Sequence, residues 1–236
     1  MGGPCFLLYD VPEADAPPPS EPPSAQQVVQ QTGVAWKLPS ATVGFPARRR
    51  RVTGPSATDN FQVVPFEFAG AEWQSVEQCY QAKKFNDEKA QELIRTMLPH
   101  AGERDHSHGM RVWSAGGSLN GVKLRSDWDA VKVEIMLRVC RAKLAAHAHL
   151  RAELLATGDV TIVGAPSTHW QSKVTGDHNW STWNGRIQEL LREEIRAAAE
   201  DAPLSERGAK LKEAFAIHMA AEGGAQHSIP GEGREG

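Results

Sequence analysis

Apolar residues recur at helical spacing along most of the chain between residues 75 and 220, and this period constrains the fold more than any other feature. Short strands are expected at residues 42–45, 62–69 and 160–163, and the Gly- and Ser-rich stretch 99–126 is expected to be a long loop. The fold class is therefore α+β, predominantly helical, with a few short β-strands. The predicted helices cover residues 75–83, 87–98, 127–140, 149–155, 183–199 and 204–220.

The two ends of the chain differ from this middle part. Residues 1–36 hold seven of the 15 prolines, four acidic residues and no Lys or Arg, whereas residues 37–236 carry a net charge of +1. Consecutive prolines lack amide donors and fix φ, so we expect a disordered, acidic tail over 1–36. A second disordered tail is expected at 223–236. Between them we expect one compact domain at 37–200 and an amphipathic helix at 201–222.

Composition limits the classes of function. Hydrophobic residues make up 40% of the chain, which is enough for a core, and the net charge of -3 argues against a strongly basic nucleic-acid surface. With no apolar run of about 18 residues, no membrane span is expected. Three scattered cysteines predict a reduced protein without a disulfide frame. We expect a cytoplasmic protein. The chain has one basic run, made of Arg48, Arg49, Arg50 and Arg51. We favour a solvated loop for this run, and the alternatives are a phosphate contact or a nuclear signal.

Two helix starts could carry chemistry. The helix that opens at Ser75 places Glu77, Gln81 and Lys84 on one face, opposite Tyr80, with Glu77 near the positive helix end. This face could meet a substrate, or it could be an ordinary solvated surface. At the next candidate, Trp128 follows a helix cap, where it could stack on a base or simply cover the core.

A third candidate combines small residues and aromatics after the strand at 160–163. Residues 164–170 and 179–185 hold three of the seven tryptophans, which could wall a pocket or only pack. The histidines at 100, 106, 108, 147 and 149 lack the spacing of a zinc site, so no metal is expected. No common nucleotide-binding, kinase, serine-hydrolase or zinc-protease motif is present.

Taken in order, these segments resemble the NADAR (YbiA-like) family over residues 42–196. The best match is Trp73 to Phe85, which is close to the family signature W-x-S-V-E-H-x-Y-Q-A-x-K-F. Four further blocks match in order and spacing, which makes the resemblance more specific than any single motif. They are Asp59 to Phe66 (S-N-F…P-F), Leu124 to Met136 (L-R-x-D-W-D…M), Lys143 to Gly158 (K-F…L-L-x-T-G) and Asn184 to Arg192 (N-x-L-G…R).

The resemblance implies a single NADAR-like domain with N-glycosidase activity on nucleotide-like ribosides. The substrate class would be a small-molecule nucleotide, an ADP-ribosylated base or a ribosylamino intermediate of riboflavin synthesis, with ADP-ribosylated nucleic acid as a further candidate. No cofactor, metal or membrane is implied. The implied catalytic residues are Glu77, Trp128 and Asp129; the implied substrate-binding residues are Asn60, Phe61, Gln81, Lys84, Lys143, Trp170 and Asn184.

One departure from the family pattern bears on activity. Bacterial members carry an acidic pair in E-x-S-P-x-D-x-x-W-G after the strand, and residues 164–171 keep Trp170 but neither acid. Asp177 is a candidate replacement. We favour a variant with an altered leaving-group site, and the alternative is a nucleotide-binding module that has lost turnover. A third alternative is a nucleic-acid accessory protein that docks through the arginine run.

Overall fold

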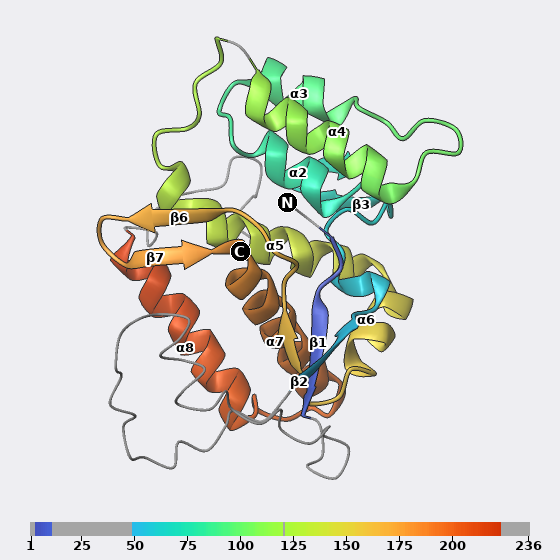
Figure 1. The fold of residues 1–236 in the computed structure, drawn as a ribbon, viewed down its shortest axis with the longest axis vertical. Helices are drawn as coiled ribbons and strands as arrows, with labels where there is room; N and C mark the ends of the chain where they lie inside the picture. Colours follow the sequence, from blue (N-terminus) through green and yellow to red (C-terminus); the bar gives the residue numbers. More distant parts are fainter. Residues whose placement is uncertain (1–2, 11–48, 120, 223–236) are drawn as a thin grey trace, which may run out of the picture.

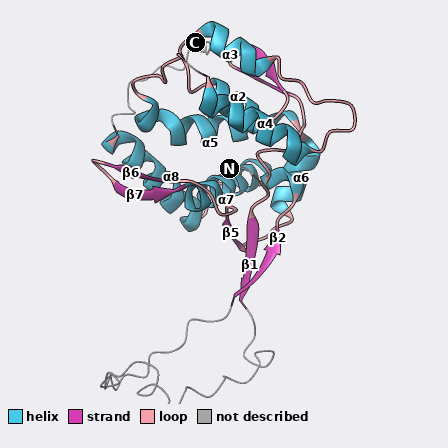
Figure 2. Ribbon diagram, turned by 45° about the horizontal axis from the view of Figure 1, so that its top comes forward, coloured by secondary structure: helices cyan, strands magenta, loops and turns pink. Residues whose placement is uncertain are grey.

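The computed structural model describes residues 3–10, 49–119 and 121–222 (Figure 1). As predicted, this part is α+β and mainly helical (Figure 2). None of its helices is both long and apolar enough to cross a bilayer. The described helices are α2 (Val76–Ala82), α3 (Glu88–Arg95), α4 (Asp105–Ser118), α5 (Trp128–Ala146), α6 (Ala148–Leu155), α7 (Trp180–Ala199) and α8 (Glu206–Ala221).

Side-chain caps fix most of the predicted helix starts. The Ser75 hydroxyl accepts from the Gln78 amide at the start of α2, and the Asp87 carboxylate accepts from the Ala90 amide at the start of α3. Helix α7 begins at Trp180, three residues before the expected start, because the Asn179 side chain caps it. Helix α5 differs from the prediction: the Asp127 carboxylate makes no cap and instead pairs with Arg125.

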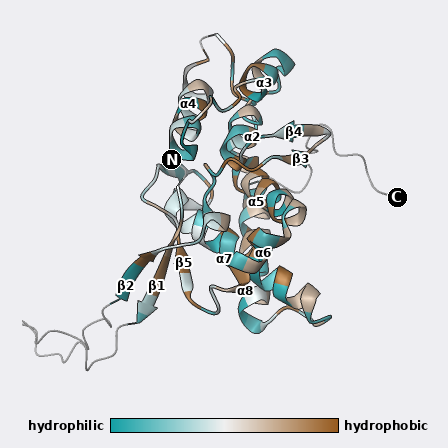
Figure 3. Ribbon diagram, turned by 90° about the vertical axis from the view of Figure 1, so that its right-hand side faces the viewer, coloured by the Kyte–Doolittle hydropathy of each residue, from teal (hydrophilic) through white to brown (hydrophobic). Residues whose placement is uncertain are grey.

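The hydrophobic core is one cluster that runs from α2 and α3 through the central helix α5 to α6, α7 and α8, and α5 and α7 contribute the largest shares of it (Figure 3 colours each residue by hydropathy). Helix α8 closes this cluster with Phe215, which is 1% exposed. The three cysteines are free and buried. The core residues of α5 and α7 are Val131, Val133, Ile135, Met136, Leu137, Val139, Cys140, Leu144, Trp180, Trp183, Ile187, Leu190 and Leu191.

A small antiparallel sheet corrects the prediction of a disordered tail over 1–36. Strand β1 (Phe6–Asp10) is its central strand, between β2 (Arg49–Thr53) and β5 (Thr161–Val163). Leu7 is buried opposite both Val52 and Ile162. Both partner strands are distant in sequence, so local composition could not indicate this pairing. Residues 1–2 and 11–36 of that tail, the strand expected at 42–45 and the tail at 223–236 lie outside the described residues.

The arginine run, which we expected in a loop, contributes to strand β2. Arg49 pairs with Asp10 at 3.1 Å, and the Arg51 guanidinium lies 5.0 Å from the centre of the Phe6 ring. Arg48 lies outside the described residues. Arg49 and Arg51 therefore contact β1 directly, and their use as a nuclear signal stays a prediction.

The prediction of a long loop at 99–126 is wrong for half of that stretch, because residues 105–118 form α4. Its glycines have low helix propensity, but two of them allow close packing, one on Phe61 and the other on α2. A Cβ on Gly109 would lie 2.3 Å from the Phe61 ring, and one on Gly116 would lie 2.0 Å from the Gln81 side chain. Tertiary contacts thus override the local preference for a loop.

Two hairpins complete the fold. Strands β3 (Phe66–Phe68) and β4 (Ala71–Trp73) replace the single strand expected at 62–69, and they turn at Gly70 with a φ of 74°. Strands β6 (His169–Ser172) and β7 (Gly176–Asn179), which the sequence did not predict, lead into α7. This second hairpin lies beside the C-terminal end of α8 (Figure 1).

Candidate functional site

A cavity of about 190 Å³ lies between α2, the start of α5, the start of α7 and the loop leading into β6. It is lined mainly by polar and aromatic side chains from these segments, with Trp113 from α4. Seven of the ten predicted site residues line it, although they are spread over more than 120 positions of the sequence. They are Asn60, Glu77, Gln81, Lys84, Trp128, Trp170 and Asn184.

Glu77 is the carboxylate of this cavity. It lies in the first turn of α2 and is only 4% exposed, so its face of the helix is not the solvated surface that we kept as an alternative. The side-chain amide of Gln81 donates to Oε1 of Glu77 at 2.6 Å. The backbone amide of Glu77 donates to the Asn60 carbonyl at 2.9 Å. Burial raises the pKa of Glu77, while the Gln81 hydrogen bond and the charge of Lys84 oppose that rise.

Aromatic side chains form a continuous wall beside Glu77. The ring of Tyr80 lies 5.0 Å from that of Trp128 and 5.5 Å, edge-on, from that of Trp180; Trp180 is in turn 5.1 Å from Trp170. The sequence placed Tyr80 on the face opposite Glu77, and this is wrong. Residues three apart are neighbours on a helix surface, so both can line one cavity. Such a wall suits a flat ring or an apolar sugar face.

Two lysines line the cavity. The Lys84 ammonium lies 5.9 Å from the Tyr80 ring centre; burial lowers its pKa, and the charge of Glu77 raises it. Lys132, which the sequence analysis missed, lies 4.2 Å from the Trp170 ring centre and pairs with Asp129 at 2.7 Å. Its position four residues after Trp128 was the available signal. Asp129 is 83% exposed and does not line the cavity.

Two predicted substrate-binding residues lie in the interior and not on the cavity. Phe61 is fully buried against α4. Lys143 is also fully buried, and its ammonium donates to the carbonyls of Ala57 and Asp59 at 2.8 and 3.0 Å. Burial lowers the pKa of Lys143. These contacts hold the loop that carries Asn60, so Lys143 supports the site from behind.

The segment that lacks the family's acidic pair also lines the cavity. Ser167, Thr168 and His169 supply its polar groups there, and Trp170 supplies an aromatic ring. Asp177 lies on β7, outside the cavity lining. Within the described part of the chain, Glu77 is therefore the one carboxylate that lines the cavity.

The fold and the cavity define a class of protein. This is a small α+β protein with a buried carboxylate, an aromatic wall and two lysines, a combination suited to a polar ligand with a flat ring and negative charge. Residues 51–194 match the NADAR domain family. The chain belongs to that family, as the order of its sequence blocks predicted.

Several known proteins are similar to this chain. The N-glycosidase YbiA of Escherichia coli (strain K12) is 36% identical over 104 residues, which cover 44% of this chain and 59% of YbiA. An N-glycosidase of Nostoc punctiforme is 35% identical over 104 residues, covering 44% of this chain and 62% of that protein. A riboflavin biosynthesis protein of Vibrio vulnificus is 30% identical over 142 residues, covering 59% of this chain and 35% of that protein.

These matches cover only part of each relative. The chain spans about three fifths of the length of the N-glycosidases that it matches. The NMR structure of E. coli YbiA is similar with a TM-score of 0.46 and 28% identity, over 64% of this chain and 83% of that one.

Proposed function

We propose that this chain is an N-glycosidase that hydrolyses the C1′–N bond of a nucleotide-like riboside. The observation that carries the proposal is the buried Glu77 carboxylate, which Gln81 holds at the cavity beside the aromatic wall. The names of the E. coli and Nostoc relatives, both N-glycosidases, support the same reaction class.

The proposed chemistry follows from the position of Glu77. As the C1′–N bond breaks, the ribose develops oxocarbenium character and the base leaves with the bonding electron pair. The ionised carboxylate of Glu77 stabilises that positive charge at a site with little water to screen it. A water oxygen then bonds to C1′, and its proton passes to Glu77 or to the departing nitrogen. Gln81 keeps the carboxylate in one orientation throughout.

The size of the cavity indicates which part of the ligand it holds. Its volume of about 190 Å³ is below the roughly 300–1,000 Å³ of typical ligand sites, so it accommodates the ribose and the reacting base, with the remainder of the nucleotide at the mouth. Trp128 and Tyr80 would stack on the ring or ribose face. Lys84 and Lys132 would meet the phosphate oxygens.

The substrate class that we propose is ADP-ribose joined to a base, or a ribosylamino intermediate of riboflavin synthesis. A relative named as a riboflavin biosynthesis protein supports the second of these. ADP-ribosylated nucleic acid is a further candidate, since a short base-bearing end could enter a small cavity while the polymer stays outside.

A noncatalytic ADP-ribose-binding module is the second candidate. The observation that favours it is the presence of only one carboxylate, Glu77, in the described cavity lining, where bacterial relatives are expected to carry a further acidic pair. Ser167 and Thr168 occupy part of that segment and offer hydroxyls, which can bind a ligand but are poor general acids at neutral pH.

The test is hydrolysis of ADP-ribosylated guanosine and of ribosylamino riboflavin intermediates, with product release followed by chromatography. Glu77→Gln should reduce turnover by at least about 100-fold, as for loss of a main transition-state contact, while ADP-ribose still binds. Glu88→Gln is the matched control, since Glu88 is an exposed first-turn glutamate of the neighbouring helix α3. Turnover by Glu77→Gln within a few-fold of wild type would refute the mechanism. Binding of ADP-ribose without any release would establish the binding module.

A further inference from the structure

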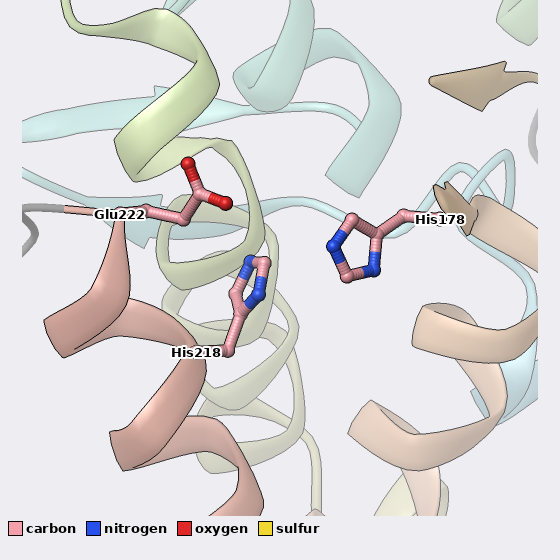
Figure 4. Close-up of side chains that lie close together, drawn as sticks. All are labelled: His178, His218 and Glu222. Carbon is pink, nitrogen blue, oxygen red and sulfur yellow. The ribbon is translucent and has the colours of Figure 1, made fainter. Parts of the chain in front are cut away.

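A second cluster of chemically active side chains lies outside the cavity. His178 of β7 faces His218 of α8 and Glu222, which directly follows α8, and one ligand atom of each lies within 4.8 Å of the others. Figure 4 shows the two imidazoles directed toward each other, with the carboxylate above them. His218 and Glu222 are four residues apart, so they project from the same face of the helix.

One nitrogen of the cluster has no partner within the described part of the chain, while its other groups already hold hydrogen bonds, including His178 Nδ1, which accepts from the Trp183 indole at 3.4 Å. His218 is 5% exposed, and its Nε2 is buried without a hydrogen-bond partner in the described part of the chain. Buried polar atoms are normally paired, so this atom requires an explanation. The Thr175 hydroxyl bridges the other two residues: it lies 2.7 Å from Nε2 of His178 and donates to Glu222, which also accepts from Ser172.

We propose that His178, His218 and Glu222 bind one divalent metal ion of the Zn²⁺ type, with a water molecule as fourth ligand. Two imidazoles and one carboxylate are a donor set that Zn²⁺ takes in tetrahedral sites. Zn–N and Zn–O bonds of about 2.0–2.2 Å place ligand atoms about 3.3 Å apart. The ligand side chains must therefore approach one another by about 1 Å. The ion then replaces the hydrogen bonds through which the Thr175 hydroxyl now links His178 and Glu222.

The surroundings of the cluster both help and oppose binding. The charges of Lys132 and Arg186 act on both histidines and oppose a cation. The nearby Glu222 carboxylate offsets part of that repulsion. We therefore expect the site to bind Zn²⁺ more weakly than a site made only of anionic ligands would.

Such an ion would connect the β6–β7 hairpin to the C-terminal end of α8. The His178 ring lies 5.2 Å from Trp170, which lines the cavity, whereas none of the three ligands does. The ion is thus placed to fix one aromatic wall of the cavity without entering it. No metal was expected from the sequence, because only the histidines at 100–108 and 147–149 lie close together along the chain, and His178 and His218 are 40 positions apart. This inference does not depend on the proposed glycosidase activity.

The test uses the full chain after treatment with EDTA. Calorimetric titration with Zn²⁺ should give one equivalent bound, and Co²⁺ should give the visible absorption of a four-coordinate site. His218→Gln and Glu222→Gln should each weaken Zn²⁺ binding by tenfold or more. His149→Gln is the matched control, since His149 is exposed and its ring lies 5.6 Å from that of His147, away from the cluster.

A second measurement separates loss of ligands from loss of fold. Because His218 is buried, circular dichroism and the melting temperature of each metal-free variant are recorded first. Zn²⁺ should raise the Tm of the wild type and of His149→Gln, and should leave the Tm of Glu222→Gln unchanged. Equal Zn²⁺ affinity of wild type and Glu222→Gln, or no stoichiometric binding to the wild type, would overturn the proposal.

Discussion

Gly116 of α4 is the position where a single added methyl group tests the packing of the candidate site. A Cβ there would lie 2.0 Å from Oε1 of Gln81 and 2.9 Å from its Cβ. The same Gln81 holds the Glu77 carboxylate. We therefore expect Gly116→Ala to displace Gln81 and disturb the orientation of Glu77, although alanine is the better helix former.

The expected magnitude follows from two opposing effects. Alanine in place of a helical glycine stabilises by about 0.5–1 kcal/mol, and overpacking of a filled interior destabilises by about 1–3 kcal/mol. The net change for Gly116→Ala is a loss of about 1 kcal/mol in the free energy of unfolding. Loss of a hydrogen bond to a charged group is worth about 1.5–3 kcal/mol, which corresponds to a loss of turnover of about tenfold or more.

Urea unfolding followed by tryptophan fluorescence measures the first effect, and the hydrolysis assay or ADP-ribose binding measures the second. Gly117→Ala is the matched control, because no described atom lies within 4 Å of a Cβ at that next position. It should be as stable as wild type or slightly more stable. If Gly116→Ala matches Gly117→Ala in both stability and ligand binding, the packing of Gln81 does not position Glu77 as we infer.

Three further predictions concern Glu77, Lys143 and Gly185. Burial raises the pKa of Glu77, so its contribution to stability is present below the unfolded value and is lost as pH rises through the folded value. In urea titrations, the stability of Glu77→Gln relative to wild type should rise as the pH increases above the ordinary glutamate pKa of about 4.3. Lys143→Met should lower the free energy of unfolding by about 1–3 kcal/mol, because two carbonyls lose their donor. If Lys143 instead bound a substrate phosphate, Lys143→Met would raise KM and leave the stability unchanged. Gly185→Ala should lower the Tm measured by calorimetry, because its Cβ would lie 2.2 Å from the Ile162 carbonyl oxygen.

The sequence predicted elements whose causes are local. The Ser75 and Asp87 caps, the apolar period of α5 and the turn at Gly70 all act within a few residues, and the structure has them. Strand β1 and helix α4 were missed for one shared reason. Each is stabilised by partners far along the chain, such as Leu7 against Ile162, and neither shows a strong local signal.

The candidate site was predicted in the same uneven way. The helical period put Glu77 and Gln81 on one face, and the next helix start singled out Trp128. The resemblance added Asn60, and all four residues line the cavity. Lys143 was misplaced because a lysine in a motif does not reveal whether its ammonium reaches a ligand or a buried carbonyl.

The sequence by itself determined the family, the helical class and the helix that carries Glu77, because these depend on short-range order. The tertiary structure decided which residues meet. It buried Glu77 and raised its pKa, placed Tyr80 in the cavity, and brought His178 to His218 across 40 positions. Spacing along a chain fixes neighbours only within one element. Contacts between elements depend on how their apolar faces pack, and that is a property of the whole fold.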